Sequence, residues 1–283
     1  MRQFATRRGY VLILTADSIS RSGTVKSTST SPFSAENCAP AATRPGLLKD
    51  ILRRTGSVNR RALDCLFPRI CVGCGRIGEY ICVECSAHLP VLHGPLCPHC
   101  GQPQSSVIIC PSCAGKPSAL SSVRSVFRFE GAVRHAIHEL KYRNLRAIAP
   151  TLAAYLAEHL STLTTTYDVV IPVPLHPKRL NRRGYNQAEL LAREVAETRG
   201  MSLSASALRR TKAGESQART GSISERLHNV VDAFSCTDTS ISGKRILLID
   251  DVCTTGATLE ACAAALSAAG ASQISGLTVA REV

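Results

Sequence analysis

The segment Ile246–Glu260 (ILLIDDVCTTGATLE) combines residue types that can bind a phosphorylated sugar. A hydrophobic stretch leads to two adjacent acids, Asp250 and Asp251, and a turn of small and hydroxyl residues follows: Thr254, Thr255, Gly256, Ala257 and Thr258. Backbone N–H groups at the start of a helix bind phosphate, and hydroxyls add hydrogen bonds. Neighbouring carboxylates can accept hydrogen bonds from ribose and help to hold Mg2+. The alternative is a simple helix cap beside two solvated acids.

Eight of the 13 cysteines form four C-x-x-C pairs. The pairs are Cys71/Cys74, Cys82/Cys85, Cys97/Cys100 and Cys110/Cys113. A two-residue spacing lets one tight turn direct both thiolates at one ion, and two such turns complete a tetrahedral shell of four sulfurs. The spacing predicts structural Zn2+ in two tandem ribbons or knuckles, with an interleaved pairing left open. A disulfide framework is the alternative, and it requires an oxidising compartment.

Residues 174–226 are rich in positive charge, with 11 basic and 5 acidic side chains. Lys178, Arg179 and Arg183 follow an apolar run that ends at Val173. Arginine and lysine side chains beyond the end of a strand can bind a polyanion, the arginines through two parallel N–H groups each. The alternative is a solvated basic loop on the surface. Asn186 can cap the next helix or contact a ligand.

The elements that must position these residues alternate along the chain. Strand patterns occupy residues 123–129, 167–173, 244–249 and 274–279, and helical patterns occupy residues 132–142, 148–160, 186–197 and 258–269. This alternation predicts an α/β fold, in which a parallel sheet is covered by helices on both faces. The acids and the basic stretch each follow a buried strand, so we expect both at the carboxyl edge of the sheet.

The formal net charge of +13 is concentrated near the start of the chain. Residues 1–62 carry 11 basic and 3 acidic side chains, a net +8. We expect residues 1–46 to be a disordered basic tail rich in Ser and Thr. Residues 47–120 are then expected to hold short helices and the cysteine pairs, and residues 121–283 the α/β domain.

Composition also narrows the class of protein. No run approaches the ~20 apolar residues that cross a bilayer, and the apolar stretch Tyr10–Ala16 is a poor signal peptide, so a cytoplasmic location is expected. The absence of Trp and an aromatic fraction of 4% argue against a broad base-stacking platform.

The order of motifs resembles the ComF family of competence-associated proteins, which pair a zinc module with a type I phosphoribosyltransferase domain. The cysteine pairs precede HELKYRNLRAIAPTLA (138–153), PVPLHPKRLNRRGYNQAELLA (172–192) and SQAR…ERLHNVVDAF (216–234). The segment with DDVCTTGAT then resembles the signature that binds phosphoribosyl pyrophosphate (PRPP). The resemblance covers about residues 47–281.

The resemblance implies a parallel-sheet type I phosphoribosyltransferase fold preceded by a small Cys-rich zinc-binding module. It implies that Asp250 and Asp251 hold the ribose of PRPP with Mg2+, and that the turn binds the 5′-phosphate through Thr254, Thr255, Gly256, Ala257 and Thr258. The implied pyrophosphate site consists of Leu175, His176, Lys178, Arg179 and Arg183. The implied flexible loop over PRPP contains Arg210, Lys212, Gln217, Arg219 and Arg226. Such a loop can seal pyrophosphate from water or lie along a nucleic-acid backbone.

Two functions follow from the resemblance. The first is a glycosyltransferase reaction, in which phosphoribose moves from PRPP to an unidentified acceptor. The second is a non-catalytic PRPP sensor or a competence factor in DNA uptake and natural transformation, with single-stranded DNA or DNA-uptake proteins as partners. A zinc-ribbon transcription regulator is disfavoured, because the chain lacks a basic recognition helix and the PRPP motif would be unexplained. The sequence does not specify the oligomeric state.

Overall fold

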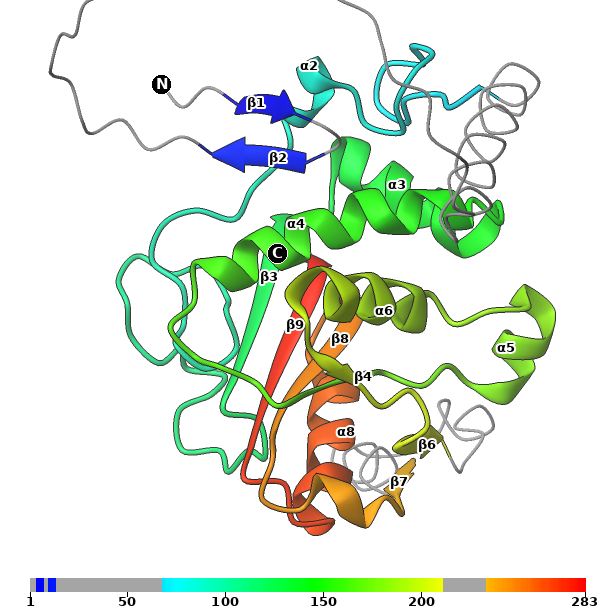
Figure 1. Ribbon diagram of the computed structural model, residues 1–283. Coiled ribbons are helices and arrows are strands. Elements are labelled where there is room, and N and C mark those ends of the chain that lie inside the picture. Colours follow the sequence, from blue (N-terminus) through cyan, green and yellow to red (C-terminus); the bar gives the residue numbers. More distant parts are fainter. Residues whose placement is uncertain (1–3, 8–9, 14–67, 211–232) are drawn as a thin grey trace, which may run out of the picture. The chain divides into compact units, whose positions relative to one another are not determined.

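The computed structural model describes residues 4–7, 10–13, 68–210 and 233–283 (Figure 1). The chain divides into two compact units, Met1–Arg69 and Ile70–Val283. In the first unit, β1 (Phe4–Arg7) pairs antiparallel with β2 (Tyr10–Ile13). The hairpin lies within the segment that is expected from its sequence to be a disordered tail, and the apolar run in β2 has the composition of a strand. The rest of the predicted tail, residues 1–46, lies outside the described residues.

The second unit contains a five-stranded sheet in which every neighbouring pair is parallel. In spatial order the strands are β3 (Ser122–Arg128), β9 (Gln273–Arg281), β8 (Arg245–Cys253), β4 (Val169–Pro172) and β5 (Ser202–Leu203). Every residue of β4 is buried, which is typical of a central strand in a parallel sheet. The predicted parallel α/β fold is confirmed.

Helices cover both faces of the sheet (Figure 1). One face packs against α3 (Gly131–Tyr142), α4 (Ala149–Ser161) and α6 (Gln187–Arg199). The other packs against α8 (Ala257–Ala268) and a small hairpin of β6 (Leu208–Arg210) and β7 (Phe234–Cys236). Alternate residues of β8 divide between the two cores: Leu247 faces the α4 side and Leu248 the α8 side.

A short helix, α5 (Pro177–Arg183), stands where the sequence predicts a basic loop. Pro177 occupies its first turn, where a missing N–H is tolerated, and His176 caps it by accepting from the Lys178 amide at 3.2 Å. Leu180 is the one apolar residue after Pro177 in this helix, so no helical periodicity was available to predict it. Two 3-10 turns, η1 (Arg146–Ile148) and η2 (Thr239–Ile241), complete the elements of the domain.

Asn186 caps α6 and also fixes the chain before it. Its Oδ1 accepts from the Ala188 amide at 3.1 Å, and its Nδ2 donates to the Val173 carbonyl at 2.9 Å. The capping role that the sequence allows is therefore confirmed. The second bond connects the start of α6 to Val173, the residue that directly follows β4.

The cysteine-rich module contains α2 (Val83–Ser86) and packs on the edge of the sheet. Val91 forms an antiparallel bridge with Phe127 of β3. Leu92 N donates to Val126 O at 2.9 Å, and Arg128 N donates to Pro90 O at 2.8 Å. The module and the α/β domain are thus joined by main-chain hydrogen bonds. Among the described residues, no helix is long and apolar enough to span a membrane.

Candidate PRPP site and zinc ribbons

The two predicted acids lie in β8, which continues past them to Cys253. Asp251 is 3% exposed, and its Oδ1 lies 2.9 Å from Lys141 Nζ at the end of α3. Its Oδ2 is buried with no hydrogen-bond partner among the described residues. Asp250 Oδ1 accepts from the Asp251 amide at 2.8 Å. Burial, followed by the neighbouring Asp251 charge, raises the pKa of Asp250, while Lys141 opposes that shift.

The turn that follows β8 has the expected form. It leads into α8 at Ala257, with Gly256 as N-cap at φ 82°. Thr254, Thr255, Ala257 and Thr258 are exposed. Thr255 Oγ1 accepts from the Ala257 amide at 3.3 Å, so this hydroxyl caps the helix and is also accessible to a ligand. The predicted strand, turn and helix are all present.

The basic residues of α5 follow β4, the neighbour of β8 in the sheet. Lys178 and Arg179 are exposed, whereas His176 is buried as the cap of α5. Leu175 is half-buried. Arg183 donates to Gln187, and its guanidinium lies 5.6 Å from the centre of the Tyr142 ring. The predicted cations therefore lie beyond the carboxyl end of β4, and β4 neighbours the strand that carries the acid pair.

The predicted flexible loop is described only at its start. Arg210 ends β6, and its guanidinium lies 5.3 Å from the centre of the Phe234 ring. The other four loop residues lie outside the described residues: Lys212, Gln217, Arg219 and Arg226.

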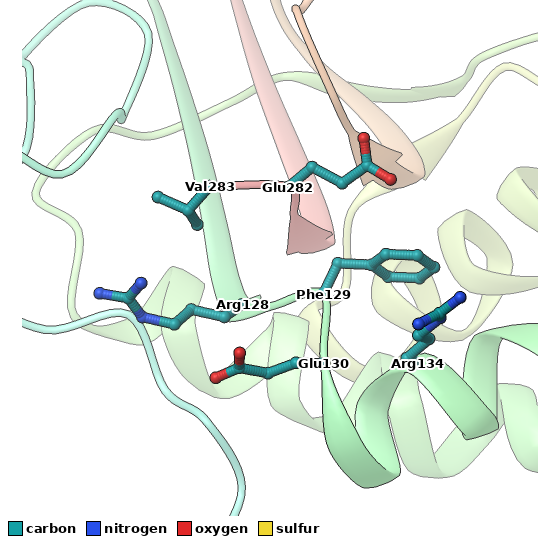
Figure 2. Close-up of a pocket in the computed structure, with 6 residues that line it drawn as sticks. All are labelled: Arg128, Phe129, Glu130, Arg134, Glu282 and Val283. Carbon is teal, nitrogen blue, oxygen red and sulfur yellow. The ribbon is translucent and has the colours of Figure 1, made fainter.

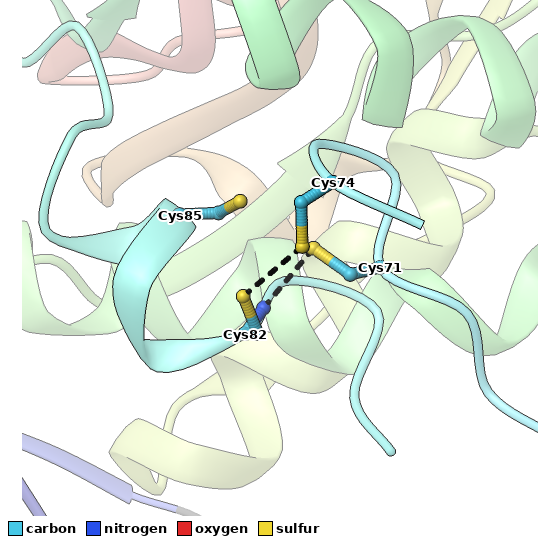
Figure 3. A group of neighbouring side chains, drawn as sticks. All are labelled: Cys71, Cys74, Cys82 and Cys85. Atoms are coloured by element: carbon cyan, nitrogen blue, oxygen red, sulfur yellow. Dashed lines mark hydrogen bonds between the residues drawn. The ribbon is translucent and has the colours of Figure 1, made fainter. Parts of the chain in front are cut away.

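The eight paired cysteines form two separate clusters (Figure 3 shows the first). Cys71, Cys74, Cys82 and Cys85 make the first, and Cys97, Cys100, Cys110 and Cys113 make the second. Within each cluster the Sγ atoms all lie within 4.8 Å of one another, and all eight residues are free thiols. The pairs therefore combine in sequence order rather than interleaved. We call the clusters with their loops the first and second ribbons.

Both clusters suit zinc by their chemistry and their shape. Four thiolates are a complete tetrahedral donor set, which is typical of structural zinc. Although burial raises the pKa of Cys71, backbone hydrogen bonds, including one from the Cys82 amide to Cys71 Sγ at 3.3 Å, lower it below the ordinary value. A Cβ on Gly73 would lie 2.8 Å from Cys85 Sγ, so the backbone approaches the sulfurs more closely than another residue would allow. Zinc at these sites would contribute directly to the folding of the module.

A polar pocket of about 410 Å³ lies at the carboxyl ends of β3 and β9 (Figure 2). It is lined by Arg128, Phe129, Glu130, Arg134, Glu282 and Val283. Phe129 N donates to Arg281 O at 2.8 Å, and Glu282 N donates to Cys253 O at 3.1 Å. These bonds connect the pocket across the sheet to the end of β8. No motif in the sequence predicts this pocket.

Comparison with known proteins decides the family. Residues 62–114 match the double zinc ribbon domain, and residues 141–282 match the phosphoribosyl transferase domain. The competence protein ComFC of Bacillus subtilis (strain 168) is 30% identical over 214 residues, which cover 72% of this chain and 85% of that protein. The chain belongs to the ComF family.

Two further relatives of this ComF-family chain carry names linked to DNA. The DNA utilization protein YhgH of Escherichia coli (strain K12) is 32% identical over 187 residues, 63% of this chain and 81% of that protein. Competence protein F of Haemophilus influenzae is 27% identical over 217 residues, 69% of this chain and 94% of that protein. The predicted family and its order of domains, zinc module before phosphoribosyltransferase domain, are confirmed.

Two charged residues beside the candidate site have no role predicted from the sequence. Lys141 belongs to the motif HELKYR, but its pairing with Asp251 depends on how α3 crosses the end of β8. Arg281 ends β9 and is 3% exposed. A basic residue after an apolar strand ordinarily faces solvent, so its sequence context gave no signal of burial.

Proposed function

We propose that this ComF-family protein binds PRPP with Mg2+ at the carboxyl edge of its sheet and transfers the phosphoribosyl group to an acceptor, with pyrophosphate as the leaving group. The observation that supports this most is the shared position of three features. The acid pair Asp250/Asp251 lies near the carboxyl end of β8, and the turn Thr254–Thr258 follows that strand. The basic helix α5 follows β4, which is adjacent and parallel to β8. Ligands of open α/β sheets bind at this edge.

The proposed division of labour follows from charge and position. The exposed Thr254, Thr255 and Thr258 hydroxyls and the amides at the start of α8 bind the 5′-phosphate, where the helix end also favours an anion. Asp250 and Asp251 accept hydrogen bonds from the ribose hydroxyls. Lys141 neutralises Asp251 within the site and orients its carboxylate.

The chemistry of the acid pair also fits Mg2+. Carboxylate oxygens are hard ligands that this ion prefers, and the buried Oδ2 of Asp251 has no partner among the described residues. When bound, Mg2+ would offset negative charge that develops on the pyrophosphate. Lys178 and Arg179 of α5 are exposed cations that can hold the same leaving group. The predicted loop residues Arg210, Lys212, Gln217, Arg219 and Arg226 would close over it.

We place the acceptor in the polar pocket beside β9. Glu282, which lines the pocket, donates its backbone N–H to the carbonyl of Cys253, and Cys253 directly precedes the phosphate turn. It offers the ring of Phe129, with the Arg134 guanidinium 6.0 Å from its centre, and the carboxylates of Glu130 and Glu282. An aromatic face and carboxylate acceptors suit a flat compound that carries N–H groups.

Calorimetric titration with PRPP and Mg2+ tests the binding site. Wild type should bind, and the double variant Asp250→Asn/Asp251→Asn should lose at least about 1.4 kcal/mol of binding free energy, a tenfold weaker affinity. Asp168→Asn is the matched control, because Asp168 pairs with Arg245 at the opposite end of β8. Undiminished binding by the double variant would contradict the proposed site.

Pyrophosphate release separates a transferase from a sensor. Wild type with PRPP, Mg2+ and a panel of nitrogen bases should release pyrophosphate with at least one base. Phe129→Ala should raise the KM for that base and leave the affinity for PRPP unchanged. PRPP binding without release for any base would favour the non-catalytic sensor.

We also propose a role in DNA uptake or utilisation, which rests on the names of the relatives and on one surface. Tyr142 is 61% exposed, and its ring lies beside the Arg183 guanidinium and 4.7 Å from the His138 ring. An exposed aromatic among cations can stack on a base of single-stranded DNA. Binding should weaken steeply with salt, and Tyr142→Ala should reduce it. Binding with no salt dependence would count against this surface.

We propose that the protein acts in the cytoplasm. Cysteines stay reduced there and can bind zinc, and the proposed role in DNA handling also fits that compartment.

A further inference from the structure

Arg281 at the end of β9 joins the second ribbon to the PRPP motif. Its Nη1 donates to Cys253 Sγ at 2.8 Å, and its Nε donates to Gln102 Oε1 at 3.2 Å. The residue is 3% exposed, and a buried guanidinium is costly unless its N–H groups are paired. Cys253 directly precedes Thr254 of the phosphate turn. Through its two hydrogen bonds, Arg281 therefore links Gln102 of the second ribbon to Cys253, the residue before that turn.

Gln102 is held in place by the second ribbon itself. Its main-chain oxygen accepts from the amide of Cys97, one of the four clustered cysteines, at 2.8 Å. The adjacent Gly101 packs so tightly that a Cβ there would lie 2.5 Å from the Val123 carbonyl oxygen. The Val123 amide in turn donates to the His99 carbonyl at 2.6 Å. The loop between Cys97 and Gln102 is thus seated against β3 by its backbone.

A second connection reaches the other side of the phosphate turn. Glu260 lies in the first turn of α8, just after the turn. Its carboxylate accepts from the Ala119 amide at 2.7 Å and from Ser118 Oγ at 2.5 Å. Ser118 and Ala119 follow Cys113, the last cysteine of the second ribbon. The turn Thr254–Thr258 is therefore anchored at both ends by chain that belongs to, or directly follows, this ribbon.

The first ribbon makes different contacts. Its Ser86 hydroxyl lies 3.0 Å from the Tyr155 hydroxyl of α4, and its Gly73 packs near Ala132 of α3. These helices cover the face of the sheet opposite α8. The first ribbon is thus a natural internal control for effects that depend on zinc but not on the PRPP motif.

From these contacts, and given the PRPP site proposed above, we infer that zinc in the second ribbon controls the affinity for PRPP. Zinc held by Cys97, Cys100, Cys110 and Cys113 fixes Gln102 and the Ser118–Ala119 segment. These hold the phosphate turn through Arg281 and Glu260. Loss of this zinc releases the turn from both anchors, and PRPP then binds more weakly because binding must order the turn.

Coupling between two sites is reciprocal, which provides a readout that does not require turnover. If zinc strengthens PRPP binding, PRPP must strengthen zinc binding by the same factor. PRPP with Mg2+ should therefore slow the transfer of zinc from the second ribbon to a zinc-selective chromogenic chelator. Release from the first ribbon, assigned as the phase that Cys74→Ser removes, should keep its rate.

The central experiment compares PRPP affinity before and after zinc is removed from the second ribbon of the full chain. A chelator that binds zinc but not Mg2+ is used, and the retained metal is counted. We expect the Kd for PRPP to rise about tenfold, equivalent to ~1.4 kcal/mol. Zinc loss from the first ribbon alone should change the Kd less than twofold, equivalent to about 0.4 kcal/mol.

Variants test the connection itself without touching a zinc ligand. Arg281→Met should weaken PRPP binding to about the same tenfold extent while retaining zinc, and later zinc removal should add little. Because Arg281→Met is a core change that can impair folding, two further variants each break one anchor. Gln102→Leu removes the acceptor of Arg281 on the ribbon side, and Glu260→Ala removes the acceptor of Ser118 and Ala119 on α8. Arg124→Met is the matched control, since Arg124 contacts the ribbon at Pro98 O but not the PRPP motif.

The possible results are distinct. No PRPP binding by zinc-loaded wild type would overturn the proposed site, and the coupling with it. Normal PRPP binding that is unaffected by zinc removal, with no protection of zinc by PRPP, would overturn only the coupling. Equal effects of both ribbons, or of Arg124→Met and Arg281→Met, would indicate general destabilisation and would also contradict it.

Discussion

The carboxylate of Asp251 is neutralised by Lys141, a residue from a different element. The Lys141 side chain is 21% exposed, and that of Asp251 is 4% exposed. Removing one partner of a buried pair leaves an uncompensated charge, which costs more than the pair contributes when it is intact. In the proposed PRPP site, Lys141 is therefore a positioning residue that would act on the ligand through the acid that it holds.

Lys141→Met should weaken PRPP binding and destabilise the fold by about 1–3 kcal/mol, because Asp251 would lose its counter-charge. Calorimetry with PRPP and urea unfolding measure the two effects. Lys141→Arg should restore much of the stability, since it keeps the charge. A Met variant as stable as wild type would show that Asp251 does not need the lysine.

The side chain of Asn186 makes two hydrogen bonds, so its removal should lower the free energy of unfolding more than the removal of an ordinary helix cap. Asn186→Ala removes the bonds to Ala188 N and Val173 O and should destabilise by about 1–2 kcal/mol. Asn186→Asp keeps the acceptor for the Ala188 amide but not the donor, and should fall between the two. Thermal unfolding of the three proteins provides the test, and equal stability of all three would exclude the capping role.

At the scale of elements, an ion pair locks the amino ends of β4 and β8 together. Arg245 of β8 donates to the Asp168 carboxylate through its backbone N at 2.8 Å, Nε at 3.2 Å and Nη2 at 2.8 Å. Hydrogen bonds from the Arg245 side chain and backbone lower the pKa of Asp168 from 3.8 to about 2. The pair lies at the edge of the sheet away from the candidate site.

The stabilisation by Asp168 should therefore depend on pH in a defined direction. A lowered pKa in the folded state favours the folded protein above the ordinary pKa of 3.8, and the effect disappears as pH falls to about 2. Asp168→Asn should be less stable than wild type at neutral pH, and the difference should shrink through that window. Carboxyl NMR titration of Asp168 with a midpoint near 3.8 would refute this.

The order of elements could be predicted because their sequence patterns are long and continuous. Val169–Ile171 forms a fully apolar run, and Leu259, Cys262 and Leu266 recur at helical spacing. The structure buries all of these residues. The helix α5 could not be predicted, because seven mostly charged residues contain no periodic apolar face and depend on Pro177 and the His176 cap instead.

The candidate site could be predicted only where it is local in the chain. The turn Thr254–Thr258 and the C-x-x-C pairs are formed by neighbours in sequence, so spacing specified them. Lys141 and Arg281 reach the site through the crossing of α3 over β8 and the pairing of β9 with β8. Those relations are tertiary, and a single sequence does not contain them in readable form.

On the scale of the whole molecule, the zinc ribbons and the α/β domain form one compact unit, Ile70–Val283. Backbone bonds from residues 90–92 to β3 join them. Removal of both zinc ions should therefore lower the melting temperature of the entire unit in a single transition, by several degrees for each ~1 kcal/mol lost. Two independent transitions in calorimetry, with the upper one unchanged by zinc, would show that the ribbons fold separately.

The ribbon segment along β3 also has a consequence for association between molecules. β3 is the last strand on its side of the sheet, and an uncovered edge offers unpaired N–H and C=O groups to another chain. Pro90–Leu92 cover part of that edge. A chain that begins at residue 121 should therefore form oligomers or aggregates through β3, whereas the longer chain should not. The zinc module would then prevent β3 from pairing with a strand of another molecule.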